Sequence, residues 1–342
     1  MNGLHDVRPV GDRTLTVVVP AYNEEENVDR VYARLSAVLN GLGLADWEII
    51  FAMDPSTDQT EAKVTDLNRA DSRVRLLRMS RRFGQPAATI AGMTAASGDA
   101  VVVIDCDMQD PPELISELVT RWVEGYDVVY AQRRSRQGET PPKRFVAWLG
   151  YRIIRKIAEV DIPKNTGDFR LMSRRVVDNV VSLEESHGFL RGLVGLVGFK
   201  QTAVEYDRDP RSAGSSKYNQ VFGSLRIGLN GVVGFSRYPL HVISLMGLLF
   251  SFLSVGGAVG YLALRLAGLG FPTGGSIAIL VSFLAGIQLL SLGIMGEYVG
   301  RIYDEVRHRP KYIVESSVGF DRESPAGVRE RAPSRVLPGR LL

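Results

Sequence analysis

Two long apolar runs near the C-terminus constrain this chain more than any other feature of its sequence. Residues 242–264 and 276–296 contain no Asp, Glu, Lys or Arg, although 23% of the 342 residues are charged. Each run reaches the ~20 residues with which an α-helix crosses a bilayer. We therefore expect two transmembrane helices, at about 242–264 and 276–297, rather than a purely soluble protein or a transporter of many spans.

Basic residues predict how this hairpin lies in the membrane. The connection between the two runs, residues 265–275, holds only Arg265. Five basic residues flank the hairpin on its two outer sides: Arg237, Arg301, Arg307, Arg309 and Lys311. Positive charge marks the cytoplasmic side, and the N-terminus lacks an apolar stretch typical of a signal peptide. We therefore expect a multi-pass protein of the cell (inner) membrane whose large N-terminal part lies in the cytoplasm.

The first two-thirds of the chain alternates short apolar runs with amphipathic segments. This alternation is typical of an α/β fold with a mostly parallel sheet covered by helices. The run at 100–104 is apolar throughout, as in a strand buried on both faces. Strands are predicted at residues 14–20, 48–51, 74–79, 100–104 and 127–131, and helices at residues 25–39, 85–96 and 143–157.

The segments around these parts complete the predicted organisation. Residues 219–240 are apolar with interspersed Arg and Asn, as in an interfacial helix; a surface helix of the globular domain is the alternative. The polar end of the chain has no hydrophobic period and is expected to be disordered. The expected divisions are a tail at 1–13, a globular domain at 14–218, the interfacial segment at 219–240, two transmembrane helices within 241–298, a juxtamembrane segment at 299–314 and a disordered tail at 315–342.

The short acidic sequence Asp105-Cys-Asp-Met-Gln109 directly follows the predicted strand at 100–104. In open parallel sheets, ligands bind beyond the carboxyl ends of the strands. Asp105, Asp107 and Gln109 offer the hard oxygen ligands that suit Mg²⁺ or Mn²⁺ held together with substrate phosphates. We therefore expect a metal and nucleotide site here.

Helix capping is the alternative interpretation of the same acidic sequence. Asp110 suits an N-cap, Pro111 suits the first helical position and Glu113 would complete a capping box. Capping leaves the neighbouring like charges of Asp105 and Asp107 without a purpose, so metal and nucleotide binding is the favoured interpretation.

Polar residues also follow the first two predicted strands. Pro20-Ala-Tyr-Asn-Glu-Glu-Glu26 ends the first strand, and Asp54-Pro-Ser-Thr-Asp58 follows the second. Each is weak alone, because Asn23 could cap a helix and the second sequence could be a turn. Together with Asp105 they would surround one crevice at the edge of the sheet, where a nucleotide's base and ribose could be recognised.

These motifs resemble those of the GT-A-fold family 2 glycosyltransferases, and most closely the polyprenyl-phosphate (dolichol-phosphate) sugar transferases. The likeness covers roughly residues 14–314 and implies inverting transfer of one sugar from a nucleotide sugar to a polyprenyl phosphate. Further sequences that carry it are Arg82-Phe-Gly-Gln85, Gly167-Asp-Phe-Arg-Leu171, Arg211-Ser-Ala-Gly-Ser-Ser-Lys-Tyr218 and Gly296-Glu-Tyr-Val-Gly-Arg-Ile-Tyr303.

The resemblance implies a role for each matching residue. The residues assigned to the nucleotide are Pro20, Tyr22, Glu24, Asp54, Asp105 and Arg133, the last of these near the diphosphate. The residues assigned to Mg²⁺ or Mn²⁺ are Asp105, Asp107 and Gln109. Asp168 matches the proposed base, and the residues assigned to the acceptor phosphate are Arg208, Arg211, Ser216 and Lys217. The resemblance also implies a homo-oligomer, with a tetramer as one form.

The chemistry of the acceptor bears on the role of Asp168. A phosphate monoester is mostly dianionic near pH 7, because its second pKa is about 6, so it needs less deprotonation than a sugar hydroxyl. Our hypothesis is that Asp168 positions or desolvates the acceptor at least as much as it removes a proton. The alternative is that Asp168 only forms an ion pair with Arg170 or Arg174.

The identity of the donor and one competing, non-catalytic function stay open. Relatives often carry Asp-Asp-Gly-Ser where this chain has Met53-Asp54-Pro55-Ser56, so the base that is recognised is uncertain: a UDP-hexose or UDP-N-acetylhexosamine is favoured, and GDP-mannose is the alternative. A non-catalytic membrane scaffold or flippase component is the alternative from another class of protein. The net charge of +3 is too small to indicate a nucleic-acid partner, and the single Cys106 excludes a cysteine-rich metal site.

Overall fold

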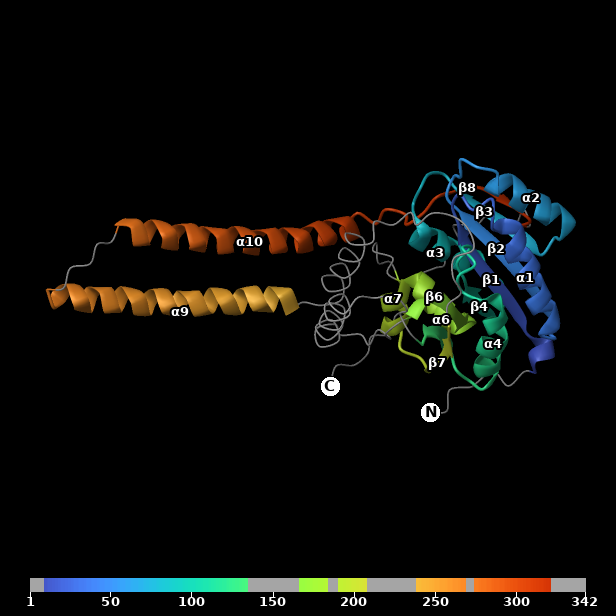
Figure 1. The fold of residues 1–342 in the computed structure, drawn as a ribbon, viewed down its shortest axis with the longest axis horizontal. Coiled ribbons are helices and arrows are strands. Elements are labelled where there is room, and N and C mark those ends of the chain that lie inside the picture. The colour runs from blue at the N-terminus through green and yellow to red at the C-terminus, as the bar shows by residue number, and fades with distance from the viewer. Residues whose placement is uncertain (1–8, 135–165, 184–189, 208–237, 269–273, 321–342) are drawn as a thin grey trace. The chain divides into compact units, whose positions relative to one another are not determined.

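The computed structural model describes residues 9–134, 166–183, 190–207, 238–268 and 274–320. The chain divides into two compact units. One contains a mixed sheet with its covering helices, and the other contains the two apolar helices (Figure 1). The helix expected at 143–157 and nearly all of the interfacial segment expected at 219–240 lie outside the described residues.

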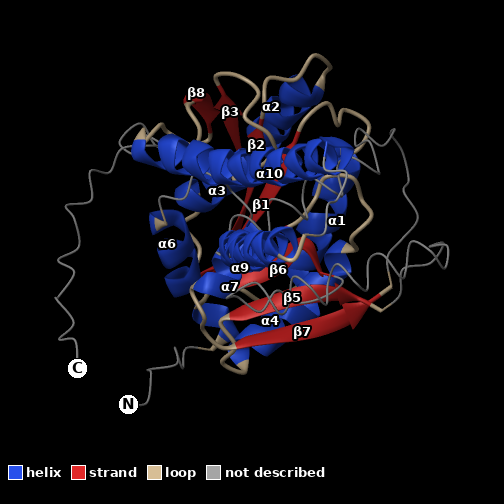
Figure 2. Cartoon of the chain, turned by 90° about the vertical axis from the view of Figure 1, so that its left-hand side faces the viewer, coloured by secondary structure: helices blue, strands red, loops and turns tan. Residues whose placement is uncertain are grey.

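The first unit is built on an eight-stranded sheet with the order β7-β5-β6-β4-β1-β2-β3-β8. Figure 2 shows β3 and β8 at one edge and β5 and β7 at the other. Strand β1 pairs in parallel with β2 and β4, as do β2 with β3 and β5 with β7, whereas β6 and β8 run antiparallel to their neighbours. The strands are β1 Thr14–Ala21, β2 Asp46–Met53, β3 Val74–Met79, β4 Ala100–Val103, β5 Val128–Arg133, β6 Thr166–Ser173, β7 Gln201–Tyr206 and β8 Val314–Val318. This arrangement confirms the expected α/β fold, with β6 and β8 running antiparallel in a sheet whose other pairs are parallel.

Helices cover both faces of the sheet (Figure 1). The apolar sides of α1 and α4 pack on one face in a continuous core. On the other face α3 lies so close to β1 that a Cβ at Gly92 would come 2.4 Å from the Val18 side chain, which explains the glycine. The helical segments are η1 Val10–Asp12, α1 Val28–Gly41, α2 Thr60–Ala70, α3 Gln85–Ala95, η2 Pro112–Leu114, α4 Ile115–Val123, α6 Arg174–Ser182 and α7 Leu190–Leu196.

The tail expected to be disordered from residue 315 begins instead with a strand. Strand β8 pairs antiparallel with β3, Val318 packs partly buried against the core, and Arg78 bridges Glu315 and Glu61. The sequence here is polar and lacks a hydrophobic period, so no local signal predicts a strand. The backbone groups along the edge of β3 provide the pairing partner.

The second unit holds two helices, α9 Tyr238–Leu266 and α10 Gly274–Val306. The rings of Phe250 and Phe283 meet edge to face between them, 6.1 Å apart. Both helices are long and apolar enough to cross a membrane, over Val242–Leu264 and Phe283–Val306. The first candidate span has the expected bounds, whereas the second begins and ends later than the expected 276–297. Helix α10 continues past residue 297, where Glu297 and Arg301 form an ion pair at 3.1 Å.

Candidate functional site

The loops after β1 and β2 are joined by hydrogen bonds at the carboxyl ends of these two strands. The backbone N–H of Asn23 donates to Ser56 Oγ at 3.1 Å, and the backbone N–H of Thr57 donates to Asn23 Oδ1 at 2.9 Å. Asn23 has a positive φ of 53° and therefore turns the chain toward the second loop. The idea that Asn23 caps a helix is wrong, since α1 begins at Val28.

The residues expected to contact a nucleotide after β1 differ in their surroundings. Tyr22 is half-buried, and the guanidinium of Arg82 lies 4.4 Å from the centre of its ring. Glu24 is also half-buried and accepts a 2.7 Å hydrogen bond from the side chain of Asn27. Pro20 is buried within β1, opposite Ala52 of β2. Tyr22 and Glu24 thus reach the surface of this edge, whereas Pro20 does not.

The carboxylate of Asp54 supports the loop after β3. Asp54 is only 3% exposed, and its two oxygens accept hydrogen bonds of 2.9 Å from the backbone N–H groups of Phe83 and Gly84. Gly84 has a φ of +92°, a conformation that glycine adopts without strain. Asp54 therefore has a structural role that its sequence context did not indicate, and a contact with the base stays a prediction.

The expected metal ligands occupy the loop directly after β4. Asp105, Asp107 and Gln109 are all half-buried. Oδ1 of Asp105 accepts a 2.7 Å hydrogen bond from the side chain of Gln85, and Oδ1 of Asp107 accepts one of 3.2 Å from the backbone N–H of Gln109. Within the described ranges, no group of three or more His, Cys, Asp or Glu side chains could hold a metal ion. Two carboxylates and an amide fit a hard divalent cation only when substrate phosphates and water complete the ligands.

The capping interpretation of Asp110 is wrong. Asp110 is 1% exposed, accepts a hydrogen bond from the hydroxyl of Tyr206 and lies 3.7 Å from the guanidinium of Arg133. The next helical segment starts with the turn Pro112–Leu114, which has no side-chain cap. Partners on β5 and β7 draw the Asp110 carboxylate into the protein, and neither partner is near it in the sequence.

Glu113, which was expected to complete the capping box, points elsewhere. Its carboxylate accepts hydrogen bonds from the guanidinium of Arg34 on α1, at 2.9 Å from Nε. This contact ties the turn before α4 to α1, and the hydrogen bond from Arg34 lowers the pKa of Glu113 although partial burial raises it. Glu113 thus links the turn η2 to α1 and does not cap a helix.

Arg133 lies at the end of β5 within this network. Its Nε donates to the hydroxyl of Tyr206 at 3.2 Å, and a Cβ at Gly167 would lie 3.1 Å from its guanidinium. Burial raises the pKa of Tyr206 to about 12, and the neighbouring carboxylate of Asp110 acts in the same direction. Tyr206 therefore stays neutral and joins Asp110 to Arg133 by hydrogen bonds.

Register places Asp168 at the same edge of the sheet. Strand β6 runs antiparallel to β4 and pairs Arg170 with Val103, so the start of β6 extends past the carboxyl end of β4 toward the loop with Asp105. Burial raises the pKa of Asp168, but nearby guanidinium groups, led by Arg191, outweigh it and lower the pKa overall. Asp168 is therefore ionised at neutral pH.

The ion-pair partner of Asp168 is neither of the two expected. Arg191 Nε donates to Asp168 Oδ1 at 2.9 Å. Arg174 instead binds the carbonyl oxygen of Gly98 at 2.6 Å and lies 3.8 Å from Asp178. Arg170 is buried, and its guanidinium donates to the carbonyl oxygen of Gly167 at 2.8 Å. The sequence offered no signal for Arg191, which is 23 positions away on another element.

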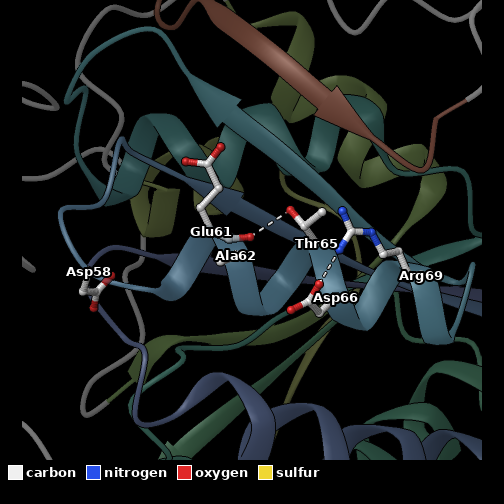
Figure 3. A pocket seen from close by; sticks show the side chains of 6 residues that line it. All are labelled: Asp58, Glu61, Ala62, Thr65, Asp66 and Arg69. Carbon is white, nitrogen blue, oxygen red and sulfur yellow. Dashed lines mark hydrogen bonds and ion pairs between the residues drawn. The ribbon is translucent and has the colours of Figure 1, made fainter.

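The acceptor-phosphate residues and a surface depression are treated apart from this geometry. The acceptor-phosphate residues Arg208, Arg211, Ser216 and Lys217 lie outside the described part of the chain. Figure 3 shows a shallow depression beside α2, whose internal contacts join Thr65 to Glu61 and Arg69 to Asp66. The residues that line it are Asp58, Glu61, Ala62, Thr65, Asp66 and Arg69. None of the expected site residues lines this depression, so it is distinct from the crevice at the sheet edge.

Comparisons with known proteins identify the family of this chain. A crystal structure of glucosyl-3-phosphoglycerate synthase from Mycobacterium tuberculosis, with Mn²⁺, UDP and phosphoglyceric acid, covers 65% of this chain and 78% of its own at 20% identity and a TM-score of 0.41. An uncharacterised glycosyltransferase of Synechocystis is 44% identical over 309 residues, 90% of this chain and 96% of its own. The bactoprenol glucosyl transferase of Shigella phage SfII is 40% identical over 306 residues, 89% of this chain and 98% of its own. The model of glycosyl transferase family 2 matches residues 16–181, and together with these full-length relatives this match shows that the chain belongs to that family.

Proposed function

We propose that this protein transfers one glucosyl residue from UDP-glucose to a polyprenyl phosphate, with inversion at the anomeric carbon. The observation that carries the proposal is the 40% identity to bactoprenol glucosyl transferase. That match covers 89% of this chain. The residues that it leaves out are fewer than those of α9 and α10 together, so the match includes part of the apolar helices as well as the sheet. A lipid-linked acceptor would account for both units, because the sheet unit would bind the donor and the apolar helices would anchor the enzyme where the lipid lies.

The acidic loop after β4 suits the departing diphosphate. Asp105, Asp107 and Gln109 would hold Mg²⁺ or Mn²⁺, which as a Lewis acid stabilises negative charge that develops on a leaving group. Arg133 would contribute a fixed positive charge beside the same group. Asp110 and Tyr206 hold Arg133 in place through the hydrogen bonds described above.

The transfer itself needs little proton chemistry. A phosphate oxygen of the acceptor forms the new bond to the anomeric carbon, and the bond from that carbon to the UDP oxygen breaks, so that UDP leaves with the electron pair. An acceptor phosphate with a second pKa of about 6 is already mostly dianionic at neutral pH. An ionised Asp168 with a lowered pKa is a weak base, which supports a positioning role for it.

The apolar helices support action at a membrane. A polyprenyl phosphate keeps its chain in the bilayer and its phosphate at the interface, so the enzyme must be anchored there. We place both flanks of the hairpin and the catalytic domain in the cytoplasm, and assign the acceptor phosphate to Arg208, Arg211, Ser216 and Lys217. A homo-oligomer, such as a tetramer, stays a prediction.

Radiolabelled donors test the proposal directly. Membranes that contain the full chain are incubated with polyprenyl phosphate and labelled UDP-glucose, UDP-N-acetylglucosamine or GDP-mannose, and label is counted in the organic phase. We expect UDP-glucose to label the organic phase. This label should disappear with EDTA and in the Asp105→Asn variant, and should remain in the matched surface variant Asp66→Asn. Label from GDP-mannose alone would identify a mannose synthase, and no label from any donor would support a non-catalytic scaffold.

A further inference from the structure

The ion pair between Asp168 and Arg191 lies at the catalytic edge and stays accessible. The two side chains are 30% and 33% exposed, so the pair is neither a core contact nor a fully solvated one. Asp168 lies on the part of β6 that extends past the end of β4. A ligand at this edge can therefore reach the carboxylate while Arg191 holds its other side.

The helix that carries Arg191 is fixed by burial. On α7, Leu190, Leu193 and Val194 are at most 6% exposed. A short helix anchored by three buried apolar side chains has little freedom to rotate, so the backbone of Arg191 is held in one position. The bond from Nε to Oδ1, 2.9 Å long, then defines the orientation of the Asp168 carboxylate.

The charges around Asp168 come from three elements. Among the described residues, Arg133 of β5, Arg170 of β6 and Arg191 of α7 act on its carboxylate, and all three lower its pKa. Arg191 is the largest of these influences and the only one that hydrogen-bonds to Asp168. The guanidinium of Arg170 is buried and directed to the carbonyl oxygen of Gly167, and that of Arg133 is directed to Tyr206.

We infer that Arg191 is a positioning residue of the transfer reaction: it acts through Asp168, holding that carboxylate ionised and in one orientation toward the reacting groups. The inference rests on the proposed function and deepens it, since it assigns Asp168 to accepting hydrogen bonds from hydroxyl groups of the bound sugar rather than to removing a proton. Nothing in the local sequence of either residue suggests the pair, because the contact depends on the packing of α7.

The test compares the kcat of glucosyl transfer at pH 7 in the full chain for the unmodified protein, Arg191→Gln, Arg191→Lys and Asp168→Asn. We expect Arg191→Gln to lower kcat by about tenfold or more, because the Asp168 carboxylate loses the hydrogen bond that orients it. Arg191→Lys keeps a cation beside the carboxylate and should restore part of the lost kcat. The double variant Asp168→Asn/Arg191→Gln should lose no more activity than Asp168→Asn alone.

Matched controls keep the inference separate from folding and from the proposed function. Arg121→Gln removes an exposed ion pair between Arg121 of α4 and Glu124, 3.1 Å long, and should leave kcat unchanged. Thermal unfolding of each full-length variant at pH 7 and about pH 2.5 needs no substrate: the stability that comes from a lowered Asp168 pKa is present above the ordinary carboxyl value and lost as the pH falls below it. The unmodified protein and Arg121→Gln should therefore lose more Tm on acidification than Arg191→Gln. A kcat that Arg191→Lys does not restore, or losses that multiply in the double variant, would overturn the inference, whereas failure of every sugar donor would overturn only the proposed function.

Discussion

The side-chain amide of Gln85 donates a hydrogen bond of 2.7 Å to Oδ1 of Asp105, joining the first turn of α3 to the acidic loop after β4. This contact orients the carboxylate from outside the loop. A hydrogen bond to a metal-ligating side chain raises metal affinity by fixing its orientation.

Removing this hydrogen bond should weaken metal binding. We expect Gln85→Ala to raise the Mn²⁺ concentration for half-maximal activity by about 10–100-fold, as is usual when such a partner is lost. The control is Gln59→Ala, since Gln59 is exposed in the loop before α2. A titration of activity against Mn²⁺ measures the shift, and equal midpoints in the two variants would contradict the role of Gln85.

Replacing the proposed metal ligands should be more severe than removing the hydrogen bond from Gln85. We expect Asp105→Asn and Asp107→Asn each to lose at least about 100-fold in kcat (about 2.7 kcal/mol), because a carboxylate is replaced by a weaker neutral ligand. EDTA should abolish activity, and added Mg²⁺ or Mn²⁺ should restore it in the unmodified protein. Full turnover in excess EDTA would exclude a metal-dependent reaction.

Asp54 should matter first for stability. Asp54→Asn keeps one acceptor oxygen for the backbone N–H groups of Phe83 and Gly84, where the carboxylate has two. Leaving a buried donor unsatisfied costs about 1–3 kcal/mol, so the free energy of unfolding should fall by that amount. Denaturant unfolding measures it, with Asp66→Asn as the exposed control. An unchanged stability together with a raised KM for the donor would favour a nucleotide contact instead.

Tyr206→Phe should disturb both Arg133 and Asp110. It removes the hydroxyl that donates to the buried carboxylate of Asp110, so we expect a loss of about 1–3 kcal/mol in stability and a lower kcat. Because the pKa of Tyr206 is raised to about 12, this hydroxyl stays protonated at lower pH, and any alkaline limb below pH 10 should be the same in the variant. Tyr126→Phe, whose ring lies under Lys200, is the matched control.

Strand β8 should contribute to the stability of the sheet. Val318→Asp would place a carboxylate against the core, so we expect a lower Tm, whereas Ser317→Asp on the exposed side of the same strand should have little effect. Circular dichroism during heating compares the two variants. Equal Tm values would show that β8 is dispensable for the first unit.

The sequence alone predicted the parts of this protein that depend on local patterns. Residues 74–79 form a strand with the predicted bounds, because apolar side chains at strand spacing report burial directly. The two charge-free runs form the long helices α9 and α10, because a continuous apolar run of ~20 residues is typical of a membrane-spanning helix. The motifs around Asp105 and Asp168 identified the family, and register brings both residues to one edge of the sheet.

Only the tertiary structure decided which side chains meet. Asp110 looked like a helix cap, yet its carboxylate accepts a hydrogen bond from the hydroxyl of Tyr206, 96 positions away. Arg191 reaches Asp168 across 23 positions, and β8 pairs with a strand more than 200 positions earlier. A hydrophobic period records whether a residue is buried, but not which distant group it touches, because that choice depends on how whole elements pack against one another.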